Sequence, residues 1–190
     1  VEPEVTSRAL MRLSVDGKPA GNTAASCPGA GTIVIGLYGK TVPETVANFE
    51  ALVMGDTDGG YSYKGTTFYK VVQGLNMQAG AVGDFSGKGL TGLSAKKEPF
   101  GPENFEVRHG AEGMVSMVRG PDTKNDSRFF ITIKPDAGWA DGRYVAFGRV
   151  LEGLDALRGI DQLKVQTPSN RPLKPVVIEE CVMLPAPDAA

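Results

Sequence analysis

The stretch from Gly113 to Phe147 constrains the fold of this chain more than any other feature. It holds two strand-like apolar segments on either side of a Gly120-Pro121 turn, then a polar connection and a third strand-like segment. Aromatic and β-branched residues favour strands, and glycine and proline favour the tight turns between them. The stretch therefore predicts an all-β surface, on which Phe130 and Trp139 are available to hold an apolar ligand.

The same signals predict strands along most of the chain. We expect strands at Arg8–Val15, Thr32–Tyr38, Phe68–Val72, Asn76–Ala79, Met114–Val118, Phe129–Ile133, Val145–Val150 and Val176–Met183. The 25 glycines and 13 prolines among the 190 residues suit the many tight turns that short strands need.

Two segments show helical periodicity instead. Val46, Phe49 and Val53 recur at helical spacing, and Pro43 suits a first helical turn, so we expect a helix over Pro43–Val53. Three regularly spaced leucines predict a short helix over Leu151–Arg158. Short strands, Gly-rich turns and two lone helices indicate a mainly β fold, an eight-stranded antiparallel closed β-barrel capped by two α-helices.

Length and composition bound the class of protein. A chain of 190 residues fits one domain, residues 1–190, and residues 1–6 and 185–190 are expected to be loosely held. The formal net charge of −2 gives no reason to expect a nucleic-acid partner. No apolar run approaches the ~18 residues that span a bilayer, so direct membrane insertion is not expected.

The residue types that bind metals and phosphates are sparse. Two cysteines and one histidine exclude a four-cysteine zinc site, and His109 is expected to be buried or to anchor a turn. The glycine-rich segment Gly80–Gly89 has Val82 and Gly89 where a Walker A loop needs glycine and serine or threonine, so we expect a surface loop. No metal site is expected.

Two polar motifs near the same strands have simple explanations. Asp136 and Asp141 lie in segments rich in turn-forming residues, so both are expected to be solvated turn residues and not an acid/base pair. Asn125-Asp126-Ser127 matches the N-glycosylation pattern, which has meaning only if the chain passes through the secretory pathway.

Several separated motifs occur in the order found in one family. They are Val42–Thr45, Asn48-Phe49, Tyr63–Phe68, Phe68–Gly80, Gly101–Phe105, Gly113–Met117, Phe129–Ile131 and Trp139–Gly142. From about Arg8 to Met183, the chain resembles the cyclophilins, peptidyl-prolyl isomerases built on an eight-stranded barrel. The resemblance implies that proline-containing peptides or protein segments bind in an external groove and that no cofactor is required.

The resemblance also implies a mechanism and a catalytic residue. Rotation about an X–Pro bond has an uncatalysed barrier of about 18–20 kcal/mol, because the C–N bond has partial double-bond character. In the family, an arginine donates a hydrogen bond to the prolyl nitrogen and weakens amide resonance. Lys70 stands at that position, and it can donate but lacks the planar fork of arginine.

The remaining groove positions are partly retained and partly changed. By resemblance, the substrate-binding residues are Leu75, Asn76, Gln78, Val118, Arg119, Arg128, Phe130, Trp139, Ala140 and Tyr144. Gln78, Phe130 and Trp139 keep the family residues, whereas the others replace them. Two alternatives stay open at this point: Phe130 and Trp139 could simply pack the barrel, and Asn76, Arg119 and Arg128 could be solvated surface residues.

Two functions are therefore compatible with the sequence. The first is a peptidyl-prolyl isomerase of reduced activity that assists protein folding or assembly. The second is a non-catalytic cyclophilin that acts as a binding or assembly subunit of a larger complex, through the groove or the loop Asn22–Gly31. Lys70, Asn76 and Ala140 favour the second function, and Gln78, Phe130 and Trp139 favour the first.

A subgroup is suggested by two further segments. The insertion Asn22–Gly31, which contains Cys27-Pro28, and the run Thr32–Pro43 resemble divergent chloroplast cyclophilins, several of which reside in the thylakoid lumen. A processed N-terminus at Val1 would fit an imported protein, although a trimmed sequence would look the same. We expect a location in the chloroplast, in the thylakoid lumen, and a role as subunit or assembly factor of a photosynthetic complex.

The two cysteines are expected to lie close together and to form a possible disulfide. In this barrel family the strand that contains Cys181 lies beside the N-terminal strands, and Cys27 is in the loop between those strands. Two independent thiols, with Cys181 buried and Cys27 exposed, remain the alternative. An oxidising lumen would permit the bond and a reducing stroma would not maintain it.

Overall fold

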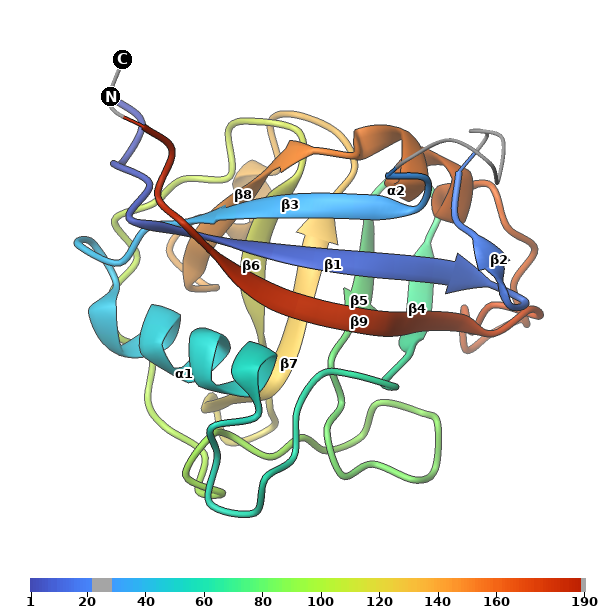
Figure 1. The fold of residues 1–190 in the computed structure, drawn as a ribbon, viewed down its shortest axis with the longest axis horizontal. Helices are drawn as coiled ribbons and strands as arrows, with labels where there is room; N and C mark the ends of the chain where they lie inside the picture. The colour runs from blue at the N-terminus through green and yellow to red at the C-terminus, as the bar shows by residue number, and fades with distance from the viewer. Residues whose placement is uncertain (22–28, 189–190) are drawn as a thin grey trace.

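The computed structural model describes residues 1–21 and 29–188 and shows a strongly curled antiparallel sheet with two helices (Figure 1). The strands are β1 (Ser7–Val15), β2 (Lys18–Pro19), β3 (Thr32–Leu37), β4 (Phe68–Val72), β5 (Asn76–Ala79), β6 (Met114–Arg119), β7 (Asn125–Thr132), β8 (Ala146–Glu152) and β9 (Val176–Pro185). The helices are α1 (Pro43–Met54) and α2 (Leu154–Asp161), with a 3-10 turn, η1, at Gly138–Ala140. The prediction of a mainly β fold with two helices is confirmed.

The strands form one sheet whose order differs from the order along the chain. The order is β2-β1-β3-β8-β6-β7-β5-β4. Strand β9 pairs with β1 along the edge opposite β3. All of these pairings are antiparallel. Eight of the strands lie where the sequence predicts them, and β2 is an additional strand of two residues.

The sheet is open between β4 and β9, so the prediction of a closed barrel is wrong. Only the segment just before β4 pairs with β9 in the described parts of the chain, through the isolated bridge between Thr67 and Val177 and through backbone hydrogen bonds of Ile178 with Gly65 at 2.7 Å and Thr66 at 2.9 Å. The segment before β9 pairs with its own preceding loop instead, since the Leu173 N–H donates to the Lys164 carbonyl at 2.9 Å. Residues 164–173 therefore pair with each other and do not extend β9 alongside β4.

Helix α1 packs its apolar side against the interior of the sheet. Phe49 lies with its ring centroid 5.2 Å from Tyr63, 5.5 Å from Phe129 and 4.9 Å from Phe147. We call these four buried residues the inner cluster. The helix begins at Pro43, as predicted, and ends one residue beyond the predicted end. The burial of four large rings makes this cluster the centre of the core.

Helix α2 begins three residues later than predicted, because β8 continues through Glu152. Gly153 separates the two elements with a φ of 89°, a left-handed conformation that side chains disfavour. A Cβ at this position would lie 2.1 Å from the carbonyl oxygen of Thr32. The close approach of β3 therefore fixes the helix start, which leucine spacing alone could not reveal.

The N-terminal residues, which we expected to be loosely held, contact β3, β8 and the loop between β3 and α1. Glu2 accepts a hydrogen bond from the Tyr38 hydroxyl at 3.2 Å and pairs with Arg149 at 3.0 Å. Lys40 forms an exposed ion pair with Glu4 at 2.6 Å. The N-terminal residues and the end of β9 lie at the same corner of the molecule (Figure 1), since β1 and β9 are antiparallel neighbours.

The described residues contain neither a membrane-spanning helix nor a cluster of metal-binding side chains. No helix in residues 1–21 and 29–188 is long and apolar enough to cross a bilayer. Within the same ranges, no three or more histidine, cysteine, aspartate or glutamate side chains converge as metal ligands would.

Candidate functional site

A pocket of about 220 Å³ opens on the outer face of the sheet, where β5, β6 and β7 run side by side. Ladder pairing places Gln78 opposite Phe130, and Phe130 opposite Ser116, so these side chains share one face. The pocket is lined by Asn76, Gln78, Val118, Arg119, Phe130, Trp139 and Tyr144. All seven are residues that the sequence analysis assigned to the groove.

The floor and one wall of the pocket are aromatic. The Phe130 ring lies 5.9 Å from Trp139 in a stacked arrangement and 5.3 Å from Tyr144 at an interplanar angle of 88°. Trp139 is 41% exposed, although it contacts both other rings. An exposed tryptophan over a buried phenylalanine forms an apolar surface that a small ring can cover.

A buried histidine supports the floor from behind. The His109 ring is stacked on Phe130 with 6.1 Å between centroids. Its Nδ1 lies 2.9 Å from Asp141 Oδ1, and its Nε2 lies 3.0 Å from Ser116 Oγ. We call His109, Phe130, Trp139 and Tyr144 the outer cluster. The expectation that His109 is buried is confirmed, and its partners on both nitrogens hold it in one orientation.

Asp141 is not the solvated turn residue that we predicted. Its carboxylate accepts a hydrogen bond from the His109 backbone N–H at 2.7 Å as well as facing the ring. Partial burial opposes the charge, but the contacts with His109 outweigh it and hold the pKa of Asp141 below its usual range. Asp136 is an exposed turn residue with a φ of 62°, as the sequence predicts.

Arg128 does not reach the pocket, and the alternative that it is a solvated surface residue is also wrong. Its guanidinium is buried and forms a bidentate pair with Asp126, with Nη2 to Oδ2 at 2.7 Å. Nη1 donates to the Gly89 carbonyl at 2.9 Å. Burial opposes the charge, but Asp126 outweighs it and raises the pKa of Arg128. The residue therefore ties the loop at Gly89 to β7.

Lys70 lies next to the pocket without lining it. It is opposite Gln78 in the ladder between β4 and β5. Gln78 Oε1 accepts a hydrogen bond from the Tyr69 hydroxyl at 3.3 Å, which orients the amide. Among the described residues, no ion pair or hydrogen bond holds the Lys70 ammonium. The ammonium is available to a ligand that enters beside Gln78.

Two other predicted residues lie outside the pocket wall. Leu75 is in the turn between β4 and β5 and is exposed. Ala140 is fully buried in η1, directly after Trp139. Its small side chain is not among the residues that line the pocket and does not contribute apolar surface to it.

Arg119 forms the rim of the pocket next to Val118. Its guanidinium lies 5.4 Å from the centre of the Tyr144 ring and donates to the Arg143 carbonyl at 3.4 Å. A cation over an aromatic face is attracted by the ring quadrupole. Arg119 thus covers one side of Tyr144 and carries a positive charge at the pocket entrance.

Asn125 cannot act as a glycosylation acceptor in the folded chain. Its side chain is 2% exposed, and it begins β7, where its backbone pairs with Phe100. A glycan needs an exposed amide. The match to the glycosylation pattern is therefore a coincidence of sequence in the folded protein.

The cysteine prediction is not tested by the structure. Cys27 lies outside the described residues, so its pairing with Cys181 stays a prediction. The Cys181 thiol donates to the Val53 carbonyl of α1 at 3.3 Å, and burial raises its pKa. A thiol in this setting is less ionised than an exposed one.

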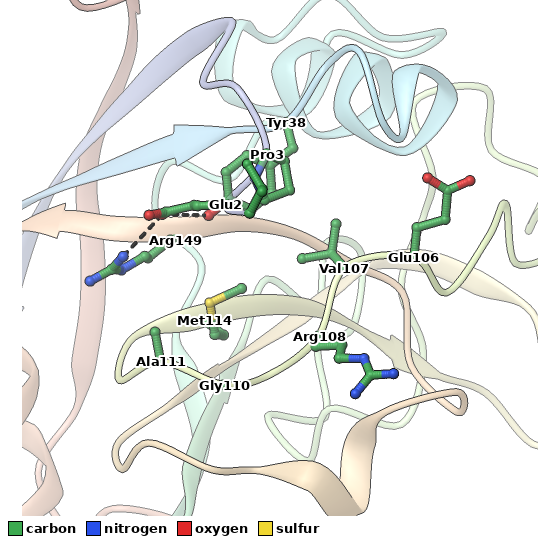
Figure 2. A pocket seen from close by; sticks show the side chains of 11 residues that line it. Glu2, Pro3, Tyr38, Glu106, Val107, Arg108, Gly110, Ala111, Met114 and Arg149 are labelled. Carbon is green, nitrogen blue, oxygen red and sulfur yellow. Dashed lines mark hydrogen bonds and ion pairs between the residues drawn. The ribbon is translucent and has the colours of Figure 1, made fainter.

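A second cavity, of about 440 Å³, is lined in part by residues 106–108 and 110–111, on either side of His109 in the sequence (Figure 2). Arg149 and Tyr38 converge on Glu2 in one wall, and Arg108 lies on the opposite side. Burial, together with the Glu2 carboxylate, raises the pKa of Tyr38. No sequence signal pointed to this cavity, because its walls come from four distant segments.

The fold and the site together define a mainly β protein with a curled antiparallel sheet and an aromatic pocket on its outer face. The family model described as "Cyclophilin type peptidyl-prolyl cis-trans isomerase/CLD" matches residues 23–183. The chain belongs to the cyclophilin-type peptidyl-prolyl cis-trans isomerase family.

Three relatives carry isomerase names. Peptidyl-prolyl cis-trans isomerase CYP21-1 of Arabidopsis thaliana is 37% identical, over 96% of this chain and 77% of the relative. Isomerases B and D of Saccharomyces cerevisiae are 40% and 35% identical, over 80% and 94% of this chain and 72% and 73% of the relatives. The similarity to each covers most of both chains.

Proposed function

We propose that this chain catalyses cis–trans isomerisation of X–Pro peptide bonds at the pocket on the outer face of β5 and β7. The observation that carries the proposal is the pairing of Lys70 with Gln78 at the edge of a pocket floored by Phe130. It combines a free donor, an oriented amide and an apolar ring site.

The arrangement supports a mechanism without a covalent step. A proline ring covers Phe130 beside Trp139, which removes apolar surface from water. Gln78 positions the substrate backbone, and the Lys70 ammonium donates to the prolyl nitrogen as its lone pair leaves amide resonance. The hydrogen bond is strongest in the twisted transition state. It therefore lowers the free energy of the transition state more than that of the ground state.

We further propose that turnover is slower than is usual for the family. An ammonium is a compact, strongly hydrated charge and lacks the planar fork of arginine. A loss of about 2–3 kcal/mol of transition-state stabilisation would slow turnover roughly 30- to 150-fold. Asn76 and the buried Ala140 also remove apolar wall around the ring.

A protease-coupled isomerisation assay on a proline peptide tests both parts. We expect a catalysed rate above background that is abolished by Lys70→Ala. A rate equal to that of an ordinary cyclophilin would contradict the slow turnover, and a rate equal to background would contradict the enzyme.

A second function, a binding or assembly subunit without turnover, is favoured by one observation. The polar Asn76 amide and the positive rim at Arg119 suit ligand recognition more than burial of an apolar ring. Peptide binding measured by titration, in the absence of catalysed exchange, would distinguish this function from the first.

We propose a location in the chloroplast, in the thylakoid lumen, where the chain assists folding or serves as subunit or assembly factor of a photosynthetic complex. The support comes from the sequence, in the segments Asn22–Gly31 and Thr32–Pro43. Immunodetection in fractions of isolated chloroplasts tests the location. Detection in the stroma, or in no chloroplast fraction, would contradict it.

A further inference from the structure

The rim of the pocket carries a positive charge that no carboxylate of the described residues neutralises. Arg119 lines the pocket, is exposed and forms no ion pair within the described parts of the chain. Lys70, beside the pocket, has no ion pair there either. None of the seven lining residues is acidic. The site is therefore positive, in a chain whose formal net charge is −2.

The acidic residues closest to the pocket in the sequence are bonded to other groups. Asp126 is paired with the buried Arg128, and Asp141 accepts a hydrogen bond from the His109 N–H. Asp122, in the turn before β7, accepts a hydrogen bond from a backbone N–H of the same turn at 3.2 Å. The positive charge at the rim is thus left for a group that comes from a ligand.

The guanidinium of Arg119 is positioned before a ligand binds. It lies 5.4 Å from the centre of the Tyr144 ring, and one of its N–H groups donates to the Arg143 carbonyl at 3.4 Å. No described residue accepts a hydrogen bond from its other N–H groups. A planar guanidinium can bind both oxygens of a carboxylate at once, and a side chain that is already positioned loses less freedom when it does so.

The strand order places Arg119 across the pocket from Lys70. Lys70 is on β4 and Arg119 is on β6, and strands β5 and β7 lie between them. Phe130, on β7, forms the floor. A proline ring over Phe130, with its nitrogen toward Lys70, leaves the opposite rim to a neighbouring residue of the same peptide. Successive Cα atoms of a peptide are about 3.8 Å apart, so a residue one or two positions from the proline can reach that rim.

We propose that Arg119 makes the pocket prefer peptides that carry an aspartate or glutamate within two residues of the proline. This inference rests on the proposed function, because it requires a proline ring to cover Phe130. The expected preference over an uncharged residue is about two- to fivefold, because an ion pair at an exposed rim is weakened by water. Arg119 is thus a specificity-determining residue for the acidic side chain, and Lys70 is left to act on the prolyl nitrogen.

Trp139 provides a binding readout that does not depend on turnover. It is the single tryptophan of the sequence, and it stacks on Phe130 in the pocket. Peptides that differ only in glutamate, glutamine or lysine, at each of the two positions on either side of the proline, are titrated against its fluorescence. We expect glutamate to bind most tightly and lysine least tightly at one or more of these positions. The preference should disappear in 1 M salt, where charges are screened beyond about 3 Å.

Substitution of Arg119 locates the effect. Arg119→Gln should bind the glutamate and glutamine peptides equally, and Arg119→Glu should prefer lysine instead. Arg12→Gln is the matched control, because it removes the same charge from a partly exposed side chain on β1, outside the pocket. It should keep the wild-type preference. Equal affinities of the wild-type protein for glutamate and glutamine at all four positions, or a preference that persists in Arg119→Gln, would overturn the inference.

Exchange rates measured by NMR on the same peptides separate this inference from the proposed function. Catalysed exchange without a preference for glutamate in binding or rate would overturn the inference and leave the isomerase intact. A preference for glutamate in binding, without catalysed exchange, would support the inference and contradict the isomerase. Binding of none of the peptides would contradict both.

Discussion

The inner and outer clusters are two groups of aromatic residues that meet at neighbouring positions of one strand. Phe129 points into the sheet and packs against Phe49 and Tyr63, whereas Phe130 points outward and packs against Trp139. The inner cluster has no exposed member, and its rings meet other rings. The outer cluster includes the buried His109 behind Phe130 and is partly open to water at Trp139. The same residue types thus serve stability on one face and ligand contact on the other.

The largest effect is expected from a substitution that disrupts the inner cluster. Phe129→Ala should lower the free energy of unfolding by about 3–5 kcal/mol, because the cavity it leaves is surrounded by rigid rings. Phe130→Ala should cost roughly half as much and abolish peptide binding. Urea denaturation of both variants, with Trp139 fluorescence as the probe, measures the difference. Equal losses would show that the two faces are not distinct in stability.

The next effect concerns the buried ion pair between Asp126 and Arg128, on the same strand as Phe129 and Phe130. Asp126→Asn should destabilise the fold by about 3 kcal/mol, since it leaves the buried Arg128 charge uncompensated. The double variant Asp126→Asn with Arg128→Gln should recover most of that loss, because no buried charge remains. If the double variant were as unstable as the single one, the cost would come from packing.

A smaller effect, on the isomerisation rate, is expected from substitution of Lys70 next to the outer cluster. Lys70→Arg should raise the isomerisation rate about three- to tenfold, through the planar fork of arginine, without reaching the usual rate of the family. Lys96→Arg, at an exposed turn position that does not line the pocket, is the matched control and should have no effect. Full recovery of the family rate in Lys70→Arg would show that Asn76 and Ala140 do not limit turnover.

The smallest effect concerns the support behind the outer cluster. The pKa of Asp141 is lower in the folded than in the unfolded chain, so its contribution is present above about pH 4 and is lost as pH falls through the folded value. Asp141→Asn should cost less than about 1 kcal/mol at pH 7, because the carboxylate is partly exposed. Wild type and variant should therefore converge in stability under acid conditions, and a gap that persists there would contradict this origin.

The sequence predicted the strands that consist of apolar and aromatic residues, and it failed where buried residues are polar. Strand β7 begins at Asn125, four residues before the predicted start, and its first half is Asn-Asp-Ser-Arg. Residues distant in the sequence hold this half of the strand: Asn48 donates to the Asp126 carbonyl, Tyr63 donates to that of Ser127, and Arg128 donates to that of Gly89. Hydrophobic periodicity along the chain does not reveal hydrogen-bond partners that are distant in the sequence.

The pocket was predicted better than its surroundings. The seven lining residues came from the family resemblance, because motif order fixes which residues meet on neighbouring strands. Arg128 and Asp141 were misjudged, since their roles depend on Asp126, Gly89 and His109 and not on the pocket. The opening between β4 and β9 also could not be predicted, because it depends on how residues 164–173 pair with one another.

The position of β1 has a consequence for biosynthesis. This first strand lies between β3 and β9 and pairs with β9 along its length, from Ser7 with Pro185 to Val15 with Val176. While the ribosome is still making the chain, one edge of β1 therefore lacks its neighbour until residues 176–185 have emerged. An unpaired strand edge is prone to wrong association. The nascent chain cannot complete its sheet until these residues have emerged, and a chain cut short before residue 176 would leave the ribosome with that edge exposed.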